Sequence, residues 1–525
     1  MDERLETMNK PKKLIEVAMP VKEISAESVR DKSIRHGHIS TLHLWWARRP
    51  LPVCRAVVFA SLVPDPLDDH CPQAFRDAVR ILLGKQNDLP GDPYRPYIDI
   101  PHTAVVDQME DHLRNRLLMF IGKFSDKYIQ NEKLGKKTPA KDTLHPYSLI
   151  KWDNKNNEDI IGRARKLIFV SHNSDSGRSA EELLAEYDRL QRVIKEAEKK
   201  LYEYPDRHLD TDPKIRELEA AKDAAIQALL TKMPKVFDPF AGGGAIPLEA
   251  ARLGCNSYGN DINPVAHIIQ KGSCEFPQRF GKPIAYSVDE YSRIYGEGEL
   301  DKQRTAGRVL GDTVQVDNRL SHDVEYFARL LLSRVQSEIS QYYPVDPDGH
   351  QVIAYYWARV GTCANPSCGA KVPLLKQFYL SRKPGKYIHL HPFIEGTDIR
   401  FEIRKGKSEQ EGWIKRGNMT CPCCHNSTDV KTLKSQFIEK ATDEKIIAVI
   451  LNGKIGKEYR LPHQNEIQVI QNIPETVEIP QEPMPVKYTQ ALPSCTWGLE
   501  KWGQMFTPRQ LLALQTFVDQ LDHLK

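Results

Sequence analysis

Apolar residues recur with helical spacing through much of the first 230 positions. One stripe between residues 183 and 201 alternates in steps of four and three: Leu183, Tyr187, Leu190, Ile194, Ala197 and Leu201. This spacing is typical of a coiled coil. A polar break, YPDRHLDTDP, follows, and a second helix is predicted over 215–230. The pattern predicts an antiparallel helical hairpin, and a structural arm is favoured over a partner-binding role.

The pattern changes over 235–266, where KVFDPFAGGGAIPLEAARLGCNSYGNDINPVA predicts strand, glycine-rich turn, helix, strand, turn and helix. LSHDVEYFARLLLSRVQSEISQYY then predicts an amphipathic helix with Ser321 as its N-cap. Beyond residue 351, the runs VIAYYWARV, KYIHLHPF and KIIAVIL predict strands of a small β-rich module. NIPETVEIPQEPMPVKY is typical of an extended linker, and TPRQLLALQTFVDQLDHLK predicts a last helix.

These changes divide the chain into five predicted segments. They are an N-terminal segment (1–73), a helical insertion with the coiled-coil-like hairpin (74–233), an α/β core (234–345), a small β-rich module (346–440), and a linker with a C-terminal helical segment (441–525).

Composition adds two constraints. Hydrophobic residues make up 40% and charged residues 27%, with a formal net charge of +4, which allows a nucleic-acid partner without requiring one. The longest apolar run, AVVFASLV, is too short to cross a membrane, and the polar start is unlike a signal peptide. We therefore expect a cytoplasmic protein with no membrane association. In that reducing compartment, clustered cysteines indicate metal binding instead of disulfides.

The glycine-rich turn excludes two common ligands. A phosphate-binding Walker loop needs Lys-Ser/Thr after the glycines, and AGGGAIPLE has neither. The dinucleotide fingerprint spaces its glycines, whereas Gly242, Gly243 and Gly244 are contiguous. Asp238, just before them, would repel a pyrophosphate and suits a cationic ligand. S-adenosylmethionine (SAM) meets this demand, because its sulfonium and its amino group are positive.

The roles expected for SAM binding follow from position in the α/β pattern. Asp238 would engage the amino group, and Asp261 would accept hydrogen bonds from both ribose hydroxyls. Pro239 and Phe240 would shape the wall, while Ala241 and the three glycines let the backbone approach the ligand. The predicted class is α/β, with a Rossmann-like SAM-dependent methyltransferase core. A glycine-rich turn kept only for packing is the alternative.

Five of the ten cysteines fall between 363 and 424. CANPSC begins with Cys363 and ends with Cys368, and CPCC begins with Cys421 and ends with Cys424. Two close pairs far apart in sequence predict a zinc ribbon whose four thiolates hold a structural zinc ion. Cys423 is an alternative to Cys421, and His425 is a weaker candidate. The nearby basic stretches FYLSRKPGKY, IRKGK and WIKRG slightly favour nucleic-acid contact, although such runs are usually solvated.

DPFAGGGAIPLEA resembles the cofactor motif of amino-methyltransferases, which methylate exocyclic nitrogens of DNA bases and sometimes of RNA bases. In order, GHISTLHLWWARRPLPVCRAVVFASLV, IKWDNKNNEDIIGRARKLI and GLEKWGQMFTPRQLLAL resemble further blocks of one prokaryotic family. In that family an uncharacterised N-terminal domain is fused to a predicted DNA methyltransferase, and its members occur in anti-phage defence islands. The resemblance implies SAM-dependent N6-adenine or N4-cytosine methylation of DNA in a phage-defence or restriction-modification system.

By this resemblance, HLWWARRPL corresponds to the segment that closes over the methionine end of the cofactor. Arg48 or Arg49 could pair with the cofactor carboxylate, and Trp45 or Trp46 could stack on the cofactor. Core packing is the alternative for the tryptophans, and a phosphate contact or a solvated face is the alternative for the arginines. The nearby His36, His38 and His43 are interpreted as ordinary hydrogen-bonding residues in preference to metal ligands.

The acceptor chemistry is missing from the sequence. Amino-methyltransferases hold the flipped base with Asp/Asn/Ser-Pro-Pro-Tyr/Phe/Trp, and this chain has no Pro-Pro dipeptide. The nearest stretch, GDPYRPY with Asp92, Pro93 and Tyr94, lacks one proline and precedes the cofactor motif. The catalytic residues are therefore unassigned. We expect a missing C-terminal region or a partner chain to supply the motif, and the isolated chain to be inactive. An RNA base methyltransferase and a non-catalytic DNA-binding subunit stay open as alternatives.

Overall fold

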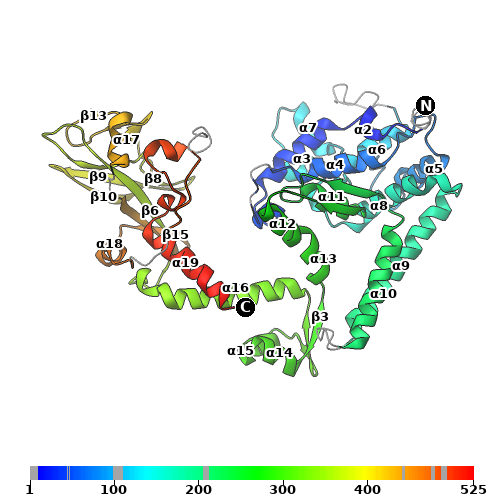
Figure 1. Cartoon of the computed structure of the whole chain (residues 1–525). Coiled ribbons are helices and arrows are strands. Elements are labelled where there is room, and N and C mark those ends of the chain that lie inside the picture. Colours follow the sequence, from blue (N-terminus) through cyan, green and yellow to red (C-terminus); the bar gives the residue numbers. More distant parts are fainter. Residues whose placement is uncertain are drawn as a thin grey trace. The chain divides into compact units, whose positions relative to one another are not determined.

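The structure is a computed structural model that describes residues 10–43, 45, 48–97, 110–204, 212–439, 444–474, 479–485 and 493–524. The chain forms two compact units, one within 1–324 and one within 325–525, and each is described by itself. It is a mixed α/β protein with several small sheets (Figure 1). The five predicted segment boundaries stay a prediction.

Helices build most of the core of the first unit. Their bounds are α2 (Leu14–Val17), α3 (Val21–Ser33), α4 (Leu51–Leu62), α5 (Gln73–Leu83), α6 (Leu113–Ile121), α7 (Asp126–Lys133) and α8 (Glu158–Asn173). Helix α4 begins directly after Pro50 and buries Leu51, Val58 and Phe59. It packs against α2, α3, α8 and α11 (Ala245–Arg252), so it is the central element of this core.

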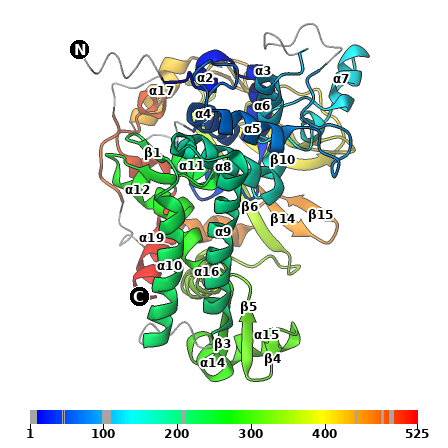
Figure 2. The ribbon, with the colours of Figure 1, turned by 90° about the vertical axis from the view of Figure 1, so that its right-hand side faces the viewer.

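The predicted hairpin helices are α9 (Ala180–Glu203) and α10 (Pro213–Leu230), which lie side by side (Figure 2). A capping box between Ser179 and Glu182 begins α9. The apolar stripe is buried only as far as Leu190, where α9 packs on the helical core. Beyond that point the stripe residues are half-buried, so the outer part of α9 has α10 as its main apolar neighbour.

The glycine-rich region folds as one βαβ unit. Strands β1 (Lys235–Asp238) and β2 (Asn256–Gly259) pair in parallel, with Lys235 opposite Asn256 and Asp238 opposite Gly259. Helix α11 lies between them in sequence, and α12 (Pro264–Gln270) follows β2. Parallel strands end at the same edge of a sheet, so the turns after β1 and β2 lie side by side.

A complete Rossmann-like sheet over 234–345 is not shown. Within the described residues, the β1–β2 sheet has two strands, whereas β3 (Ile284–Ser287), β4 (Val309–Leu310) and β5 (Thr313–Val316) form a separate antiparallel sheet. Between these sheets lie a π-helical turn (Lys271–Glu275) and α13 (Phe276–Phe280), and α14 (Val288–Tyr295) and α15 (Glu297–Thr305) separate β3 from β4. The glycine motif specifies only its own βαβ unit, because further parallel strands need βα units of their own.

The long amphipathic helix α16 runs over Arg319–Ile339 and contains the boundary between the two units. The prediction that Ser321 is its N-cap was wrong. The side chain of Asn318 takes that role, because its Oδ1 accepts a hydrogen bond of 2.9 Å from the backbone N–H of Ser321.

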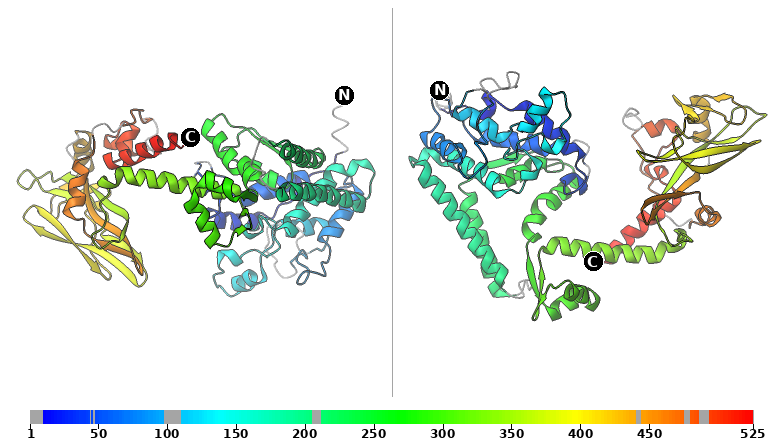
Figure 3. Two further views of the ribbon diagram at one scale, coloured as in Figure 1. Left: turned by 90° about the horizontal axis from the view of Figure 1, so that it is seen from below. Right: turned by 180° about the vertical axis from the view of Figure 1, so that it is seen from behind.

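The second unit is rich in β-structure, as predicted (Figure 3). One sheet has the order β15-β14-β6-β7, from β6 (Gln351–Thr362), β7 (Lys371–Pro373), β14 (Glu444–Gly453) and β15 (Gly456–Arg460). A second, antiparallel sheet contains β8 (Tyr379–Lys383), β9 (Lys386–Glu395) and β10 (Asp398–Lys405). The short strands β11 (Ile414–Lys415), β12 (Asn418–Thr420) and β13 (Ser427–Thr428) form a third. The helices are α17 (Val430–Ile438), α18 (Gln464–Gln471) and α19 (Pro508–Asp522).

In the part of the chain that the structure describes, no helix combines the length and the apolar character that crossing a bilayer requires.

A buried ion pair joins α4 to α11. Arg55 Nε donates to Glu249 Oε2 at 2.6 Å, and Arg55 Nη1 donates to the carbonyl of Leu149 at 2.8 Å. Both charged side chains are at most 1% exposed, and Arg252 also binds Glu249. Because α11 begins at the glycine-rich turn, this pair fixes that turn to the helical core.

We predict that Glu249→Ala lowers the free energy of unfolding by about 3–5 kcal/mol, because it leaves the Arg55 charge buried without its carboxylate. Urea denaturation of the full chain measures this change. The matched control is Asp77→Ala, which breaks a surface pair with Arg80 and should cost about 0–1 kcal/mol. Equal losses for the two variants would contradict the assignment.

Candidate functional site

The turn between β1 and α11 requires glycine at two positions. Gly242 has φ +53° and Gly244 has φ +83°, a region that other residues enter only with strain. The N–H of Ala241 donates to the carbonyl of Asn260 at 2.9 Å, and the N–H of Gly244 donates to the carbonyl of Ala241 at 2.8 Å. The turn is therefore tied both to itself and to the loop after β2.

Asp261, in the loop after β2, holds this turn closed. Its Oδ2 accepts a hydrogen bond of 2.8 Å from the N–H of Gly242, and its Oδ1 accepts one of 2.9 Å from the N–H of Asn263. The sequence predicted a ligand contact at Asp261 but not these two hydrogen bonds to the backbone of the turns. A carboxylate has about four acceptor positions, so two are left over for another partner.

Asp238, the last residue of β1, is 8% exposed. Its Oδ1 accepts a hydrogen bond of 3.0 Å from the N–H of Phe240. Its Oδ2 has no hydrogen-bond partner among the described residues, and Arg49 Nη1 lies 3.6 Å from it, outside hydrogen-bond distance. A buried carboxylate oxygen without a donor is costly, so this atom is suited to a cationic ligand.

The segment before α4 lies against the glycine-rich turn. A Cβ atom on Gly242 would come within 2.7 Å of Trp45 Nε1, and one on Gly243 within 3.4 Å of Trp45 Cβ. Arg49 Nη1 also lies 3.4 Å from the carbonyl oxygen of Phe240. Gly242 is thus required both by its φ and by the indole beside it. The other tryptophan expected here, Trp46, lies outside the described residues.

These elements surround one cavity of about 350 Å³. Its lining includes Trp45, Arg48 and Arg49 from the first segment, residues 240–243 from the turn, and Asp261. The other predicted residues, Asp238, Pro239 and Gly244, do not line the cavity, although each lies within two positions of a lining residue in the sequence. Phe240 is 76% exposed, so it forms a rim and not a packed wall. Whether these residues bind a cofactor stays a prediction.

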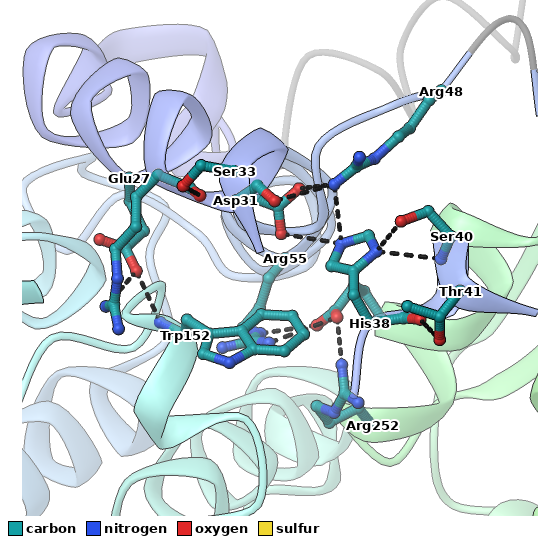
Figure 4. Close-up of polar contacts among 12 residues, drawn as sticks. Glu27, Asp31, Ser33, His38, Ser40, Thr41, Arg48, Arg55, Trp152 and Arg252 are labelled. Atoms are coloured by element: carbon teal, nitrogen blue, oxygen red, sulfur yellow. Dashed lines mark hydrogen bonds and ion pairs between the residues drawn. The ribbon is translucent and has the colours of Figure 1, made fainter. Parts of the chain in front are cut away.

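Arg48 is anchored by a buried network beside the cavity (Figure 4). Arg48 Nη2 donates to the backbone carbonyl of Asp31 at 2.8 Å and lies 3.2 Å from Asp31 Oδ2. The N–H of Ser40 donates to His38 Nδ1 at 3.0 Å, and His38 Nε2 lies 3.0 Å from Asp31 Oδ1 and 3.2 Å from Arg48 Nη2. The side chains of Asp31 and His38 are both fully buried.

Sequence analysis missed Asp31, and it described His38 only as a hydrogen-bonding residue. Trp152 of the IKWDN stretch stacks on His38 with ring centroids 5.2 Å apart, so two of the stretches that carry the family resemblance meet in the fold. The backbone N–H of Trp152 donates to Glu27 Oε1 at 2.8 Å, which ties this stretch to α3. Among the described residues, no group with metal-ligand geometry includes His36, His38 or His43.

GDPYRPY does not offer an acceptor-base site. Tyr94 is 1% exposed and packs edge-on against Phe120. Asp92 forms an ion pair with Arg116, with 3.0 Å between Arg116 Nη2 and Asp92 Oδ2. Tyr94 is therefore buried in the core, and the Asp92 carboxylate is engaged by an arginine.

The four predicted cysteines of the second unit come together. The sulfur atoms of Cys363, Cys368, Cys421 and Cys424 all lie within 4.8 Å of one another. Cys363 Sγ is 3.6 Å from Cys424 Sγ, and Cys368 Sγ is 3.8 Å from Cys421 Sγ. Zinc–sulfur bonds of about 2.3 Å in a tetrahedron place sulfur atoms about 3.8 Å apart, so the spacing fits zinc.

Two tight turns carry these sulfurs. The N–H of Cys368 and that of Gly369 both donate to the carbonyl of Asn365, and Gly369 has φ +54°. In the second turn, the N–H of His425 donates to the carbonyl of Cys421, and His425 has φ +61°. Cys423, the alternative to Cys421, and His425, the weaker candidate, are not in the four-sulfur group. Cys421 is in it.

Comparison with known proteins gives two partial matches. Residues 18–80 match the model of a family described as "Protein of unknown function (DUF1156)". The type II methyltransferase M.MvaI of Kocuria varians is 31% identical over 77 residues, which are 14% of this chain and 17% of that enzyme. The chain thus spans less than a fifth of this relative's length. No solved structure matches the chain.

The family match includes α3, the segment before α4, and α4 itself. It therefore contains Arg48 and Arg49, which line one side of the cavity, and Asp31 and His38, which contact Arg48 from behind that lining. The opposite side, from the glycine-rich turn and Asp261, lies outside the matched residues. The similarity to a methyltransferase is distant and partial.

Four thiolates would fill a tetrahedral coordination sphere, so a metal ion there would brace the fold without activating water. A second group, Asp346, Asp348 and His350, also has ligand atoms close together. Asp346 already pairs with Arg460 at 2.8 Å and Asp348 is exposed, so this group is better explained by that ion pair.

We predict that the purified chain contains about one zinc ion and that Cys421→Ser loses it, because a closed site needs all four thiolates. Metal analysis by mass spectrometry measures the content. The matched control is Cys423→Ser, two residues away and outside the group, which should retain the metal. Zinc retained in Cys421→Ser, or lost in Cys423→Ser, would show that the ligand set is wrong.

Proposed function

We propose that this chain binds SAM in the cavity between the glycine-rich turn and the segment before α4, as the cofactor-binding part of a DNA amino-methyltransferase. The β1-α11-β2 unit is then the first unit of a Rossmann-like methyltransferase core. The observation that carries the proposal is the convergence of residues 240–243, Asp261 and Trp45 on one cavity of about 350 Å³. This volume is in the range of small-molecule sites.

The residues around the cavity fit the groups of SAM. Asp238 Oδ2, which accepts no hydrogen bond from the described residues, suits the amino group, and the two remaining acceptor positions of Asp261 suit the ribose hydroxyls. Arg48 Nε is buried and has no hydrogen-bond partner in the described parts of the chain, so it suits the carboxylate. When bound, SAM supplies a methyl group activated by its sulfonium; the protein's own residues bind and orient it.

Two observations support methyl transfer as the reaction. The distant match to a type II methyltransferase and the resemblance of DPFAGGGAIPLEA to amino-methyltransferase motifs favour a modification enzyme. DNA as the substrate, N6-adenine or N4-cytosine as the target, and a role in phage defence or restriction-modification are parts of this proposal. Methylation of an RNA base is the alternative with the same cofactor site.

In this proposal, the residues that hold the base to be methylated are not among these 525. The 525 residues contain no Pro-Pro dipeptide, and the nearest substitute is buried or ion-paired. We propose that another polypeptide segment supplies the loop that holds the base, and that this chain alone binds the cofactor without transferring its methyl group. The same absence favours a second candidate function, a non-catalytic DNA-binding subunit, which would show no cofactor binding.

We predict that Asp261→Asn and Asp238→Asn each weaken binding of S-adenosylhomocysteine about tenfold or more, because each removes a charge-assisted hydrogen bond to the ligand. Titration calorimetry on the full chain measures this. Asp223→Asn, on the exposed surface of α10, is the control and should bind like the unmodified chain. No binding heat from the unmodified chain, or equal affinities for all variants, would rule out the proposed site.

The two arginines should act in opposite directions. Arg48→Gln is expected to weaken binding, because Arg48 is held in place by Asp31 and meets the ligand carboxylate. Arg49→Gln is expected to strengthen binding severalfold, because Arg49 lies 3.6 Å from Asp238, where the ligand's amino group belongs. The same calorimetric titration compares them. Equal losses in both variants would mean that Arg49 is a ligand contact and not a displaced counter-ion.

A further inference from the structure

Basic residues of the second unit come together where the β8–β9 turn, the end of β10 and the β14–β15 turn meet. Lys383 and Lys386 are cross-strand partners at the turn between β8 and β9. At the end of β10, Lys405 pairs with Ile388 of β9, and the N–H of Gly406 donates to the carbonyl of Tyr387 at 2.9 Å. The chain from β10 therefore continues alongside the β8–β9 turn and adds further cations there.

The turn between β14 and β15 reaches the same place. A Cβ atom built on Gly456 would lie 3.8 Å from the ammonium nitrogen of Lys386. Lys454 and Lys457 flank Gly456 in this turn, and Lys457 pairs with Asn452 across the hairpin. Segments around residues 384, 406 and 455 thus meet in space, although about 20 to 70 residues separate them in the sequence.

We call this cluster the basic tip. It consists of seven exposed residues: Arg382, Lys383, Lys386, Lys405, Lys407, Lys454 and Lys457. In the described ranges, no carboxylate forms an ion pair with any of them. By contrast, the cations that precede Lys405 in β10 are neutralised. Arg400 pairs with Asp398, and Arg404 pairs with Glu402.

Like charges gathered without counter-ions repel one another, and a bound polyanion would remove that repulsion. A single basic run in a sequence is usually a solvated face. Here the fold assembles one surface from three turns, which the sequence alone did not reveal. The hairpins that carry it share a hydrophobic core with Cys363 and Cys421, so the four-cysteine cluster supports the surface from within.

We infer that the basic tip binds the phosphate backbone of duplex DNA. Duplex DNA presents one negative charge for about every 1.7 Å of its axis, a density that suits a cluster of lysines. Single-strand binders need exposed rings on which bases stack. The rings nearest the tip, Tyr379 and Tyr387, are half-buried beneath Arg382 and Lys407, so they are not free for stacking.

The choice of DNA over RNA rests on the proposed function, whereas the choice of a phosphate backbone rests on the charges alone. Backbone contacts position a protein on DNA without reading its sequence. The basic tip would therefore dock the substrate, and any base recognition would come from other residues.

The test compares two triple variants of the full chain by fluorescence anisotropy with a labelled short duplex over a series of salt concentrations. The tip variant carries Lys383→Gln, Lys386→Gln and Lys405→Gln. The matched control carries Lys136→Gln, Lys137→Gln and Lys141→Gln, three exposed lysines of the first unit, so both variants have the same net charge. Thermal melting should show equal stability for both.

We expect the tip variant to bind duplex DNA about tenfold or more weakly. The slope of log Kd against log salt should fall by about 2.7, which is 0.9 for each of three lost phosphate contacts. The control variant should keep the affinity and slope of the unmodified chain. No DNA binding by the unmodified chain, an unchanged slope in the tip variant, or equal losses in both variants would overturn the inference.

Two further binding experiments, with other nucleic acids and with polyglutamate, identify the polyanion. Tighter binding of single-stranded DNA or duplex RNA, lost in the tip variant, would overturn the assignment to duplex DNA. Equal competition by polyglutamate would indicate an acidic protein partner instead. Titration of the tip variant with S-adenosylhomocysteine separates the two proposals, because a defective basic tip leaves the cofactor cavity unchanged and a failed cofactor site leaves the salt slope unchanged.

Discussion

The hydrogen bond from the N–H of Gly242 to Asp261 is the constraint on which the candidate site depends. It joins the turn after β1 to the loop after β2, and so it sets the edge of the parallel pair at which a ligand would bind. Glycine is required at this position because its φ is positive and because its missing side chain leaves room for Trp45. Any larger residue would be strained at this φ and would meet the indole of Trp45.

Around this bond, burial divides the charged residues into two kinds. Arg55 with Glu249 and Asp31 with His38 are buried pairs that hold α4, α11 and α3 in place. Arg48 and Asp238 are only partly satisfied, and they face or adjoin the cavity. Buried groups that lack partners are uncommon in a folded protein, and their presence beside a cavity is the physical reason for expecting a charged ligand there.

The sequence predicted what short-range patterns specify. The glycine-rich turn, the two hairpin helices and the four cysteines all depend on local spacing, and the structure has them. It did not predict the two-stranded extent of the β1–β2 sheet, because sheet size depends on distant segments. The anchoring of Arg48 by Asp31, the cap at Asn318 and the basic tip were also missed, since each needs the folded positions of separated residues.

The central claim is that the cavity beside Asp261 binds a nucleoside with a charged amino-acid tail. The most direct measurement is a crystal structure of the chain grown with S-adenosylhomocysteine. We expect the ribose hydroxyls within hydrogen-bond distance of the Asp261 carboxylate, and the amino group beside Asp238 with Arg49 moved away. A ligand bound elsewhere, or Arg49 still beside Asp238 at saturating ligand, would contradict the account.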